Sequence, residues 1–430
     1  MTDPSITIEA EPVPAAGSVP APVSRDAGFG FIFVSALLNA LSFGLMIPVL
    51  PNLIKHFLGG DFALASFWSF VFATTWGLMQ FFFGPVLGML SDRFGRRPVM
   101  LLSIGGLGVD FLFMAFAPTL AWLFVGRVFN GMTASSFSTA NAYLADVTAP
   151  EQRAKNFGML GSAFSFGFLL GPALGGYLGD INLRLPFMVA AGLCAVNWFY
   201  GLLVLPESLP PEKRIAAFDW RKANPVGALN LLRSHRDLLA LAAMSMLFWL
   251  AQNVLPSIFI LYTGFRFHWT LSVQGLTFIA TGAAGIVVQV FLVGPVVKRI
   301  GERGAVLLGA TCGGLGFLIY ALAPNGLIFM CAVPVFAGMS FLMPGLQGLM
   351  TQRVGPRQQG QLQGANQSLQ GIGAVVGPAL YGLTFAWSVR HDATLHLPGL
   401  PILIAAALMG LNLMIALQKA HPRDPGEALE

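Results

Sequence analysis

Long apolar runs, separated by short polar or charged segments, fill the chain from residue 29 to residue 418. A helix rises about 1.5 Å per residue, so a run of roughly 20 residues can cross the hydrocarbon core of a membrane. We cut the runs at charged residues and at Gly and Pro. The pattern predicts twelve helices, at 29–54, 67–90, 98–117, 119–142, 157–179, 185–205, 238–263, 272–296, 304–323, 326–350, 361–386 and 397–418.

Composition supports a membrane protein and excludes several other classes. The 430 residues are 55% hydrophobic and 10% charged, with a mean hydropathy of +0.71. A soluble domain carries about 25% charged residues, so this charge is too sparse to solvate a globule of this size. Aromatic residues at 12% and 50 glycines exclude a disordered chain or a long coiled coil. We therefore predict an all-α polytopic membrane protein.

Basic residues are divided unevenly between the two sides of the predicted membrane. If both termini are cytoplasmic, nineteen of the 24 Lys and Arg residues fall in cytoplasmic segments, four in outer loops and one, Arg127, inside a helix. Helical membrane proteins carry such an excess on the cytoplasmic side, so the bias predicts both termini inside. The net charge of +5 is then no sign of a nucleic-acid partner.

The two halves of the chain match each other at a constant offset of 206 residues. The matched pairs include Gly95 with Gly301, Ala117-Pro118 with Ala323-Pro324, and Gly171-Pro172-Ala173-Leu174 with Gly377-Pro378-Ala379-Leu380. A six-helix repeat keeps the same orientation in both halves. It therefore predicts two parallel repeats, with the ligand site between them near the middle of the membrane.

The repeat and the charge pattern together predict the organisation of the chain. Its parts are a disordered cytoplasmic N-terminal tail at 1–28, a six-helix half at 29–205, a cytoplasmic linker at 206–237, a second six-helix half at 238–418 and a cytoplasmic tail at 419–430. Within the linker, a surface helix over residues 216–232 and a solvated segment are both open interpretations.

A glycine- and arginine-rich string joins the second and third predicted helices. Its candidate gate residues are Gly88, Asp92, Arg93, Gly95, Arg96 and Arg97. A carboxylate among arginines can exchange ion-pair partners between conformations, or lie against the N-terminus of a helix in the other half. A plain positively charged loop is the alternative. In the repeat copy the acid is replaced by Lys298, so we predict two gates that are not equivalent.

A second string runs along the fifth predicted helix. Its members are Gly158, Gly167, Gly171, Pro172, Gly175 and Gly176. Glycines spaced four residues apart share one helix face and permit close helix contact, and proline permits a bend. Ordinary packing of small residues is the alternative interpretation.

Two ionisable residues, Asp110 and Arg127, lie deep inside predicted spans. At about 1.5 Å per residue, both lie roughly 10–12 Å from the outer ends of adjacent helices. Charge in this region is costly unless it is paired or hydrated. A static ion pair is one interpretation. The other is a carboxylate that gains and loses protons in the transport path, which predicts proton coupling through Asp110 and Arg127.

Uncharged polar and tryptophan side chains within the spans predict an aqueous cavity with aromatic walls. The candidates are Asn39, Trp76, Gln80, Trp249, Gln252, Asn253, Gln289, Gln347, Asn366 and Gln370. For each residue alone, a hydrogen bond between helices is an alternative. The three cysteines have no metal-ligand spacing, and the six histidines are scattered. We therefore expect no metal, no cofactor and no enzymatic site.

These strings resemble those of the major facilitator superfamily over essentially all of 29–418. The Gly88–Arg97 string looks like the signature loop of the superfamily, and the second string is similar to that of its drug/proton antiporters. More narrowly, Gly44-Leu-Met-Ile-Pro48-Val-Leu-Pro51 and Gln358-Gln-Gly360-Gln-Leu-Gln-Gly364 resemble the tetracycline-efflux proteins. The resemblance implies twelve transmembrane helices in the major facilitator fold, alternating access, and an inner-membrane monomer.

The chain also departs from the tetracycline-efflux pattern. Where those pumps carry an acid in helix 1, a histidine in helix 8 and an acid in helix 9, this chain has Asn39, Gly285 and Gly313. In the family these groups are associated with protons and with the cationic metal–tetracycline chelate. Their loss implies a neutral, amphipathic or anionic substrate, with Asp110 and Arg127 as the remaining intramembrane charges.

We therefore predict a secondary active transporter that exports a small amphipathic organic compound or drug in exchange for protons. Its expected partners are that substrate, protons and the lipid bilayer. An uptake carrier or uniporter for a small metabolite has the same fold and stays an alternative. A membrane receptor that has lost transport is a third possibility, because three ionisable groups are missing from the helical core.

Overall fold

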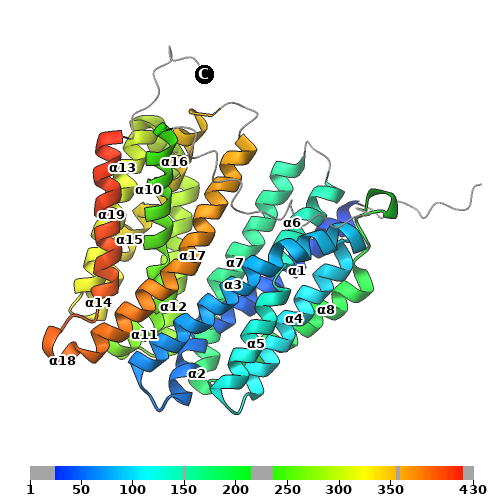
Figure 1. Cartoon of the computed structure of the whole chain (residues 1–430), viewed down its shortest axis with the longest axis horizontal. Helices are drawn as coiled ribbons and strands as arrows, with labels where there is room; N and C mark the ends of the chain where they lie inside the picture. Colours follow the sequence, from blue (N-terminus) through cyan, green and yellow to red (C-terminus); the bar gives the residue numbers. More distant parts are fainter. Residues whose placement is uncertain (1–24, 149–151, 215–235, 355–358, 420–430) are drawn as a thin grey trace, which may run out of the picture.

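The computed structural model describes residues 25–148, 152–214, 236–354 and 359–419. Every regular element in these ranges is helical, and the helices form two bundles side by side (Figure 1). The possible surface helix at 216–232 and most of the two tails lie outside the described residues.

The first bundle holds the helices before the linker. They are α1 (Arg25–Met46), α2 (Leu50–Phe57), α3 (Phe62–Phe94), α4 (Arg96–Phe116), α5 (Leu120–Thr133), α6 (Ser136–Val147), α7 (Arg153–Ile181) and α8 (Leu185–Val204). A short 3-10 turn follows at Pro211–Lys213.

The second bundle holds the helices after the linker. They are α10 (Arg236–Gln252), α11 (Val254–Phe267), α12 (Leu271–Val287), a π turn at Val288–Leu292, α13 (Val293–Leu322), α14 (Gly326–Cys331), α15 (Val333–Ala337), a 3-10 turn at Gly338–Phe341, α16 (Leu342–Thr351), α17 (Gln359–Arg390), α18 (Asp392–Leu395) and α19 (Leu400–Lys419).

Ten helical segments of the described chain are long and apolar enough to cross a membrane. One of them, Leu271–Leu322, has 52 residues and turns at Gly301, where φ is +72°. This segment therefore contains two of the predicted spans. The predicted span 119–142 is shared by α5 and α6, both shorter than 18 residues. The all-α membrane architecture is confirmed, and the count of twelve spans stays a prediction.

Several predicted helices are interrupted in the structure, among them 238–263, which is divided at Asn253 between α10 and α11. The predicted helix 29–54 begins earlier, at Arg25, and is interrupted by a turn at residues 47–49. Pro48 lacks the N–H that a continuous helix needs, which explains the turn. The predicted helix 326–350 is made of α14, α15, a 3-10 turn and α16. Pro334, at the start of α15, similarly removes one backbone donor.

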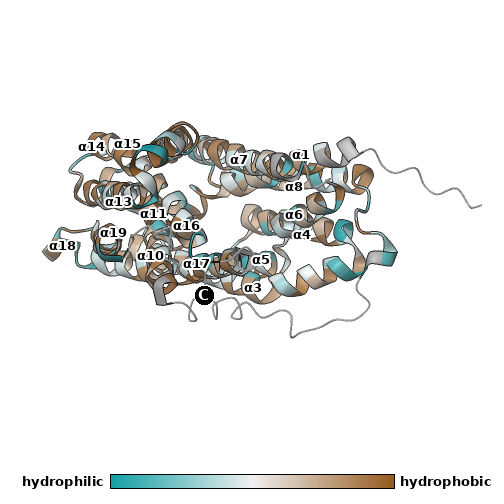
Figure 2. Ribbon diagram, turned by 90° about the horizontal axis from the view of Figure 1, so that it is seen from above, coloured by the Kyte–Doolittle hydropathy of each residue, from teal (hydrophilic) through white to brown (hydrophobic). Residues whose placement is uncertain are grey.

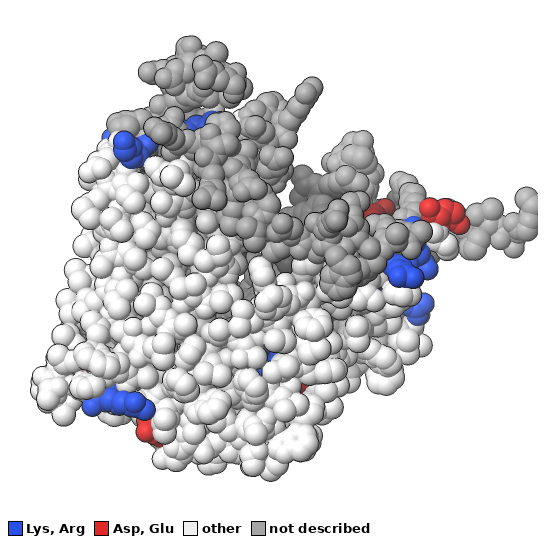
Figure 3. All heavy atoms as spheres, in the orientation of Figure 1, with Lys and Arg blue, Asp and Glu red and all other residues white. Residues whose placement is uncertain are grey.

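The surface of the described chain suits a lipid environment. Figure 2 shows apolar residues along much of the helical ribbon, and Figure 3 shows charged side chains mainly near the two ends of the visible face. Phe82, Leu203 and Leu327 are 61%, 82% and 74% exposed. Side chains this apolar and this exposed mark a surface that contacts lipid or another apolar partner.

The sequence repeat reappears in the backbone. The equivalent boundaries are the ends of α4 and α13 at Phe116 and Leu322, the starts of α5 and α14 at Leu120 and Gly326, and the starts of α7 and α17 at Arg153 and Gln359, each pair 206 residues apart. The turns at Gly95 and Gly301 both have positive φ, at 111° and 72°. A residue with a Cβ is disfavoured in that conformation, so both turns require glycine.

The bundles meet mainly along two pairs of helices, α3 with α17 and α7 with α12, and α11 also contacts α2 and α3. We call the end where α1 begins and α19 ends the terminal face, and the opposite end the distal face (Figure 1). Near the distal face, the Ser66 hydroxyl donates a hydrogen bond of 2.8 Å to the Gly382 carbonyl of the other bundle. Gly275 of α12 lies against Pro172 of α7, where an added Cβ would lie 2.5 Å from the proline carbonyl oxygen.

The same helices separate toward the terminal face. A Cβ at Gly77 of α3 would contact Val375 of α17 at 3.8 Å, but Cβ atoms at Gly84 and Gly88 would meet nothing within 4 Å. On α17, a Cβ at Gly371 would likewise meet nothing within 4 Å. The bundles therefore touch at the distal face and part toward the terminal face. A two-bundle molecule in this arrangement is closed at one end and open at the other.

Candidate functional site

The structure joins the two intramembrane charges in one ion pair. Asp110 on α4 and Arg127 on α5 lie 2.8 Å apart, measured from Oδ2 to Nη1. Asp110 is 0% exposed and Arg127 is 4% exposed. Among the described residues they are the only charged side chains that are buried. The tight Ala117-Pro118 turn makes α4 and α5 antiparallel neighbours, which places both groups at one depth.

Arg127 also contacts two other helices of the first bundle. Its Nη1 donates to the Met46 sulfur at 3.1 Å, and its guanidinium carbon lies 5.8 Å from the Trp76 ring centre. Trp76 Nε1 in turn donates to Asn130 Oδ1 at 2.7 Å. A continuous chain of contacts therefore leads from Asp110 through Arg127 to Trp76, which is half-buried.

The ion pair is not saturated with hydrogen bonds. Within the described part of the chain, Asp110 Oδ1 and Arg127 Nε have no hydrogen-bond partner. Met46 and Asn130 were not predicted as neighbours of the pair. The sequence could have indicated Asn130 as a neighbour, because it follows Arg127 by three residues and lies on the same helix face. The sequence could not have indicated Met46, since its helix is remote from α5 in the sequence.

The candidate gate is held by acids of its own bundle. Asp92 pairs with Arg96, whose Nε also donates to Asp146 Oδ2 at 3.1 Å. Glu207, after α8, accepts the backbone N–H groups of Arg96 and Arg97 at 2.8 and 3.3 Å. N–H groups at the start of a helix have no partner within the helix, and together they favour an anion such as the Glu207 carboxylate. Asp146 and Glu207 were not predicted as gate residues, because neither is near the string in the chain.

The remaining gate residues shape the turn or lie at its surface. Gly95 supplies the positive φ between α3 and α4, and Arg97 donates to the Leu202 carbonyl. Arg93 is exposed, with its guanidinium carbon 5.3 Å from the Phe94 ring centre. Gly88 lies earlier on α3, facing open space.

The repeat copy of the gate is built differently. Lys298 is exposed, at the position equivalent to Asp92. Glu302 accepts from the Gln352 amide at 3.3 Å, and Arg303 donates to the Leu417 carbonyl at 3.0 Å. The described chain therefore holds no second copy of the Asp92–Arg96 pair at this position.

The glycine string packs α7 closely on two neighbours. Cβ atoms at Gly167, Gly171 and Gly175 would lie 2.5 Å from Ala40 Cβ, 2.6 Å from Gly44 Cα and 2.2 Å from the Leu45 carbonyl oxygen of α1. Gly176 instead faces α12 of the other bundle, Pro172 has its ring against Gly44 of α1 and its carbonyl against Gly275 of α12, and Gly158 faces open space. The string thus lets α7 fit between α1 and α12, as the packing interpretation requires.

Comparison with known proteins identifies the architecture. The family model of the Major Facilitator Superfamily matches residues 32–378. The chain belongs to this superfamily. It is an integral membrane protein and a transporter of small molecules, and its fold and relatives are those of transporters rather than enzymes.

Its curated relatives include tetracycline resistance proteins. The class C protein of Escherichia coli is 35% identical over 382 residues, covering 86% of this chain and 95% of the relative. The class B protein of Escherichia coli is 32% identical over 392 residues, covering 90% and 95%. The predicted resemblance to the tetracycline-efflux proteins is confirmed.

Solved structures share the fold at lower identity. The human organic anion transporter MFSD10 (TETRAN) matches with a TM-score of 0.64 and 23% identity, over 92% of this chain and all of the other. The nucleoside transporter NupG matches with a TM-score of 0.73 and 15% identity, over 92% of this chain and 99% of the other.

Two predicted cavity residues of this transporter lie on faces that turn toward the other bundle. Gln80 follows Gly77 by three residues on α3. Gln289 follows Gly282 of α12 by seven residues and lies in the π turn after that helix. Gly77 approaches Val375, and a Cβ at Gly282 would lie 2.8 Å from Leu169. Both glutamines are exposed, in the region where the bundles part.

Two other predicted cavity residues are buried in this conformation. Asn39 is 6% exposed and accepts a hydrogen bond of 3.3 Å from the Asn197 amide of α8. Asn366 is also 6% exposed. Neither side chain is open to solvent in this conformation, and a role for them in lining a cavity stays a prediction. For Asn39, the hydrogen bond between helices explains the polar residue.

The other candidates lie in the second bundle, except for Trp76. Trp249, Gln252, Asn253 and Gln347 are partly exposed, and Gln370 is exposed. Asn253 donates to the Trp249 carbonyl at 2.7 Å, where α10 passes to α11. Gly373 and Gly377 of α17 pack against these two residues. Trp249 and Asn253 thus lie at the α10–α17 contact.

Proposed function

We propose that this transporter exports a small amphipathic organic compound in exchange for protons by alternating access. It acts in the inner membrane as a monomer, with both termini in the cytoplasm. The buried Asp110–Arg127 pair carries the proposal, because a proton-coupled transporter needs a group inside the membrane that can bind and release a proton. The tetracycline resistance proteins and the Bacillus subtilis multidrug resistance protein 2, 25% identical over 411 residues, support export of a drug-like compound.

The conformation agrees with the expected order of events. If both termini are cytoplasmic, as the charge bias predicts, the terminal face is the cytoplasmic one and this conformer is open to the cytoplasm. An exporter that exchanges protons must release its proton on the same side on which it takes up its substrate. Asp110 lies 2.8 Å from the Arg127 guanidinium, a contact that is stronger when the carboxylate is ionised.

Protonation of Asp110 would leave Arg127 without its anion. Arg127 already contacts Trp76 and the Met46 sulfur, so these groups can hold the cation after the pair opens. A substrate packed on the half-buried Trp76 would compete for the same ring. Arg127 would then return to Asp110 and displace its proton, which couples substrate binding to proton release.

The substrate is proposed to be neutral or anionic. At Gly313 an acidic side chain would require the Met409 and Met339 side chains to move, since even a Cβ would lie 2.9 and 3.0 Å from their atoms. Asn39 is buried against Asn197, and Gly285 faces open space without a side chain. No negative charge thus stands at these three positions to attract a cationic chelate.

The experiment is transport into proteoliposomes with an acidic interior and the cytoplasmic side outward. The panel contains neutral, anionic and cationic amphipaths and the tetracycline–magnesium chelate. We expect a neutral or anionic compound to accumulate, and a protonophore to abolish its accumulation. Entry that stops at equal concentrations on the two sides, whatever the pH gradient, would favour a uniporter. Preference for the cationic chelate would overturn the substrate proposal.

The membrane orientation gives a separate prediction. In intact cells, an impermeant thiol reagent should label a His391→Cys variant, because His391 is exposed at the distal face. The same reagent should not label Thr2→Cys or His421→Cys. The control is labelling after the cells are permeabilised, when all three variants should react. Labelling of either terminus in intact cells would contradict the proposed orientation.

The gate gives a second prediction. Asp92→Asn should lower the transport rate by about tenfold, because it weakens the charge-assisted contact with Arg96 at a moving helix junction. Lys298→Asn should lower it by less than about twofold, since an exposed charge contributes little. Both variants should accumulate normally in the membrane. Equal losses of transport at the two positions would argue against an asymmetric gate.

A further inference from the structure

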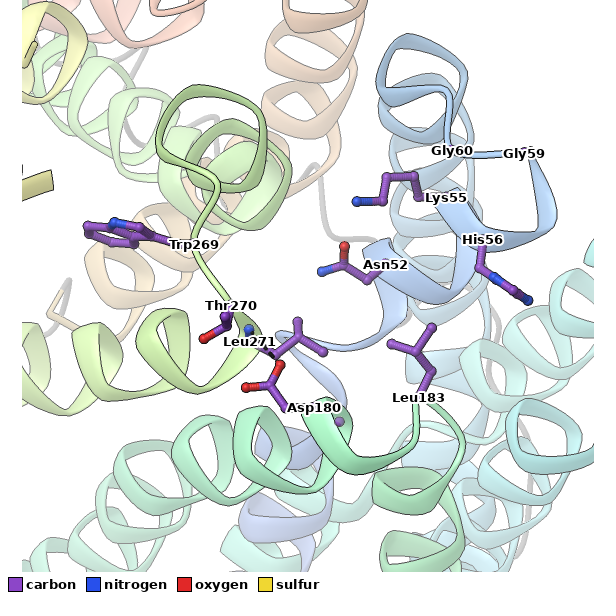
Figure 4. Close-up of a pocket in the computed structure, with 11 residues that line it drawn as sticks. Asn52, Lys55, His56, Gly59, Gly60, Asp180, Leu183, Trp269, Thr270 and Leu271 are labelled. Carbon is purple, nitrogen blue, oxygen red and sulfur yellow. Dashed lines mark hydrogen bonds between the residues drawn. The ribbon is translucent and has the colours of Figure 1, made fainter. Parts of the chain in front are cut away.

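At the distal face, a carboxylate of the first bundle accepts hydrogen bonds from the second bundle. Asp180 lies near the end of α7, and its oxygens accept the backbone N–H groups of Leu271 and Ser272 at 3.0 and 2.9 Å. The Ser272 hydroxyl donates to the same carboxylate. Figure 4 shows Asp180 directed toward Leu271, across the junction between the bundles.

These contacts complete the N-terminus of α12. The first N–H groups of a helix have no partner within the helix, and together they favour a negative charge. Thr270, of the same bundle, caps the N–H of Val273 at 3.4 Å. The N–H groups of Leu271 and Ser272 are capped from the other bundle, by Asp180. The start of α12 is therefore satisfied only while α7 stays beside it.

The backbones of the two helices approach closely around this contact. A Cβ at Gly176 would lie 2.2 Å from the Leu271 carbonyl oxygen, and one at Gly179 would lie 2.8 Å from the Leu271 side chain. Asp180 is nevertheless exposed, on the wall of a cavity of about 610 Å³ that Lys55, Trp269 and other residues line (Figure 4). Water entering this cavity can therefore take over the three hydrogen bonds when the helices part.

We call the contact between α7 and α12 at the distal face the distal gate. We propose that Asp180 is the latch of this gate, and that the gate opens when Asp180 releases the N-terminus of α12. Access from the distal face requires α7 and α12 to separate, and the Asp180 side-chain contacts described above all join those two helices. At the terminal face, the comparable acid Asp92 pairs with Arg96 of its own bundle. The latch goes beyond the proposed function, because it serves an exporter or an importer equally and requires no proton.

The test uses a cysteine reporter at the buried crossing of α3 and α17. Ser66 is 1% exposed there, and Ser66→Cys changes little volume. The three native cysteines are replaced by alanine, and an impermeant thiol reagent is added from the distal side. In this background, Asp180→Asn should raise the labelling rate at position 66 by about tenfold, because the distally open conformer becomes more populated. Ser272→Ala removes one of the three contacts and should raise it by a smaller factor.

Asp61→Asn is the matched control. Asp61 also caps a helix at the distal face, accepting from the N–H groups of Ala63 and Leu64 at 2.8 and 3.0 Å, but within one bundle. Its loss should leave the labelling rate unchanged, within about twofold. The proposal is overturned if neither Asp180→Asn nor Ser272→Ala speeds labelling, or if Asp61→Asn speeds it as much as Asp180→Asn. Since the readout is conformation and not flux, failure of the proton proposal would not change it.

Discussion

Asp110→Asn should abolish uphill transport and leave substrate binding and downhill exchange largely intact. Asparagine has nearly the shape of aspartate and can still accept a hydrogen bond from Arg127, so the contact survives in weaker form. The asparagine amide does not bind and release protons near neutral pH. The pH gradient would then no longer drive the substrate, and the accumulation ratio in proteoliposomes should fall to about one.

A control separates this effect from a general loss of charge. Glu212 lies exposed in the 3-10 turn at Pro211–Lys213 of the terminal face, and Glu212→Gln should keep the wild-type accumulation ratio. If Asp110→Asn still concentrates substrate at a near wild-type rate, the Asp110–Arg127 pair is structural. The proton would then take another route, or no proton would be coupled.

Arg127→Ala should destabilise the folded protein far more than Asp110→Asn or the substitutions at the two gates. It leaves Asp110, which is 0% exposed, as an unpaired buried carboxylate, and it empties the space between Met46 and Trp76. Removing one partner of a buried ion pair costs about 3–5 kcal/mol. We expect a lower unfolding temperature in detergent and less protein in the membrane.

The double variant Asp110→Asn with Arg127→Leu distinguishes an unpaired charge from a simple cavity. It removes both charges and restores apolar volume, so it should recover most of the lost stability while transport stays uncoupled. Arg390→Ala, at the exposed end of α17, should change stability by less than about 0.5 kcal/mol. A double variant as unstable as Arg127→Ala alone would show that the arginine stabilises the bundle through packing.

The sequence predicts those features of the fold that local pattern determines. Apolar runs predict the spans, and the offset of 206 residues recurs in helix boundaries and in the positive φ of Gly95 and Gly301. The turn at Pro48 was missed because apolar residues continue on both sides, so hydropathy alone does not reveal the break. Exact helix ends depend on caps and tertiary contacts that the pattern does not contain.

The candidate site could be predicted only in part. A buried acid and a buried arginine are conspicuous because charge is rare in spans, and the short turn between α4 and α5 indicates that they share a depth. The acceptor of Asn197 could not be predicted to be Asn39, nor the start of α4 to be capped by Glu207, because both contacts join remote segments. Polar residues in a span also look alike whether they face a cavity or a neighbouring helix.

The most direct test of proton coupling through Asp110 records proton movement and substrate movement together. Wild-type protein and Asp110→Asn are reconstituted into proteoliposomes that contain a pH-sensitive dye, and substrate is added without an imposed pH gradient. We predict that substrate entry through the wild-type protein drives protons outward, and that the Asp110→Asn protein exchanges substrate with no change of internal pH. Proton movement coupled to substrate in the Asp110→Asn protein would contradict this prediction.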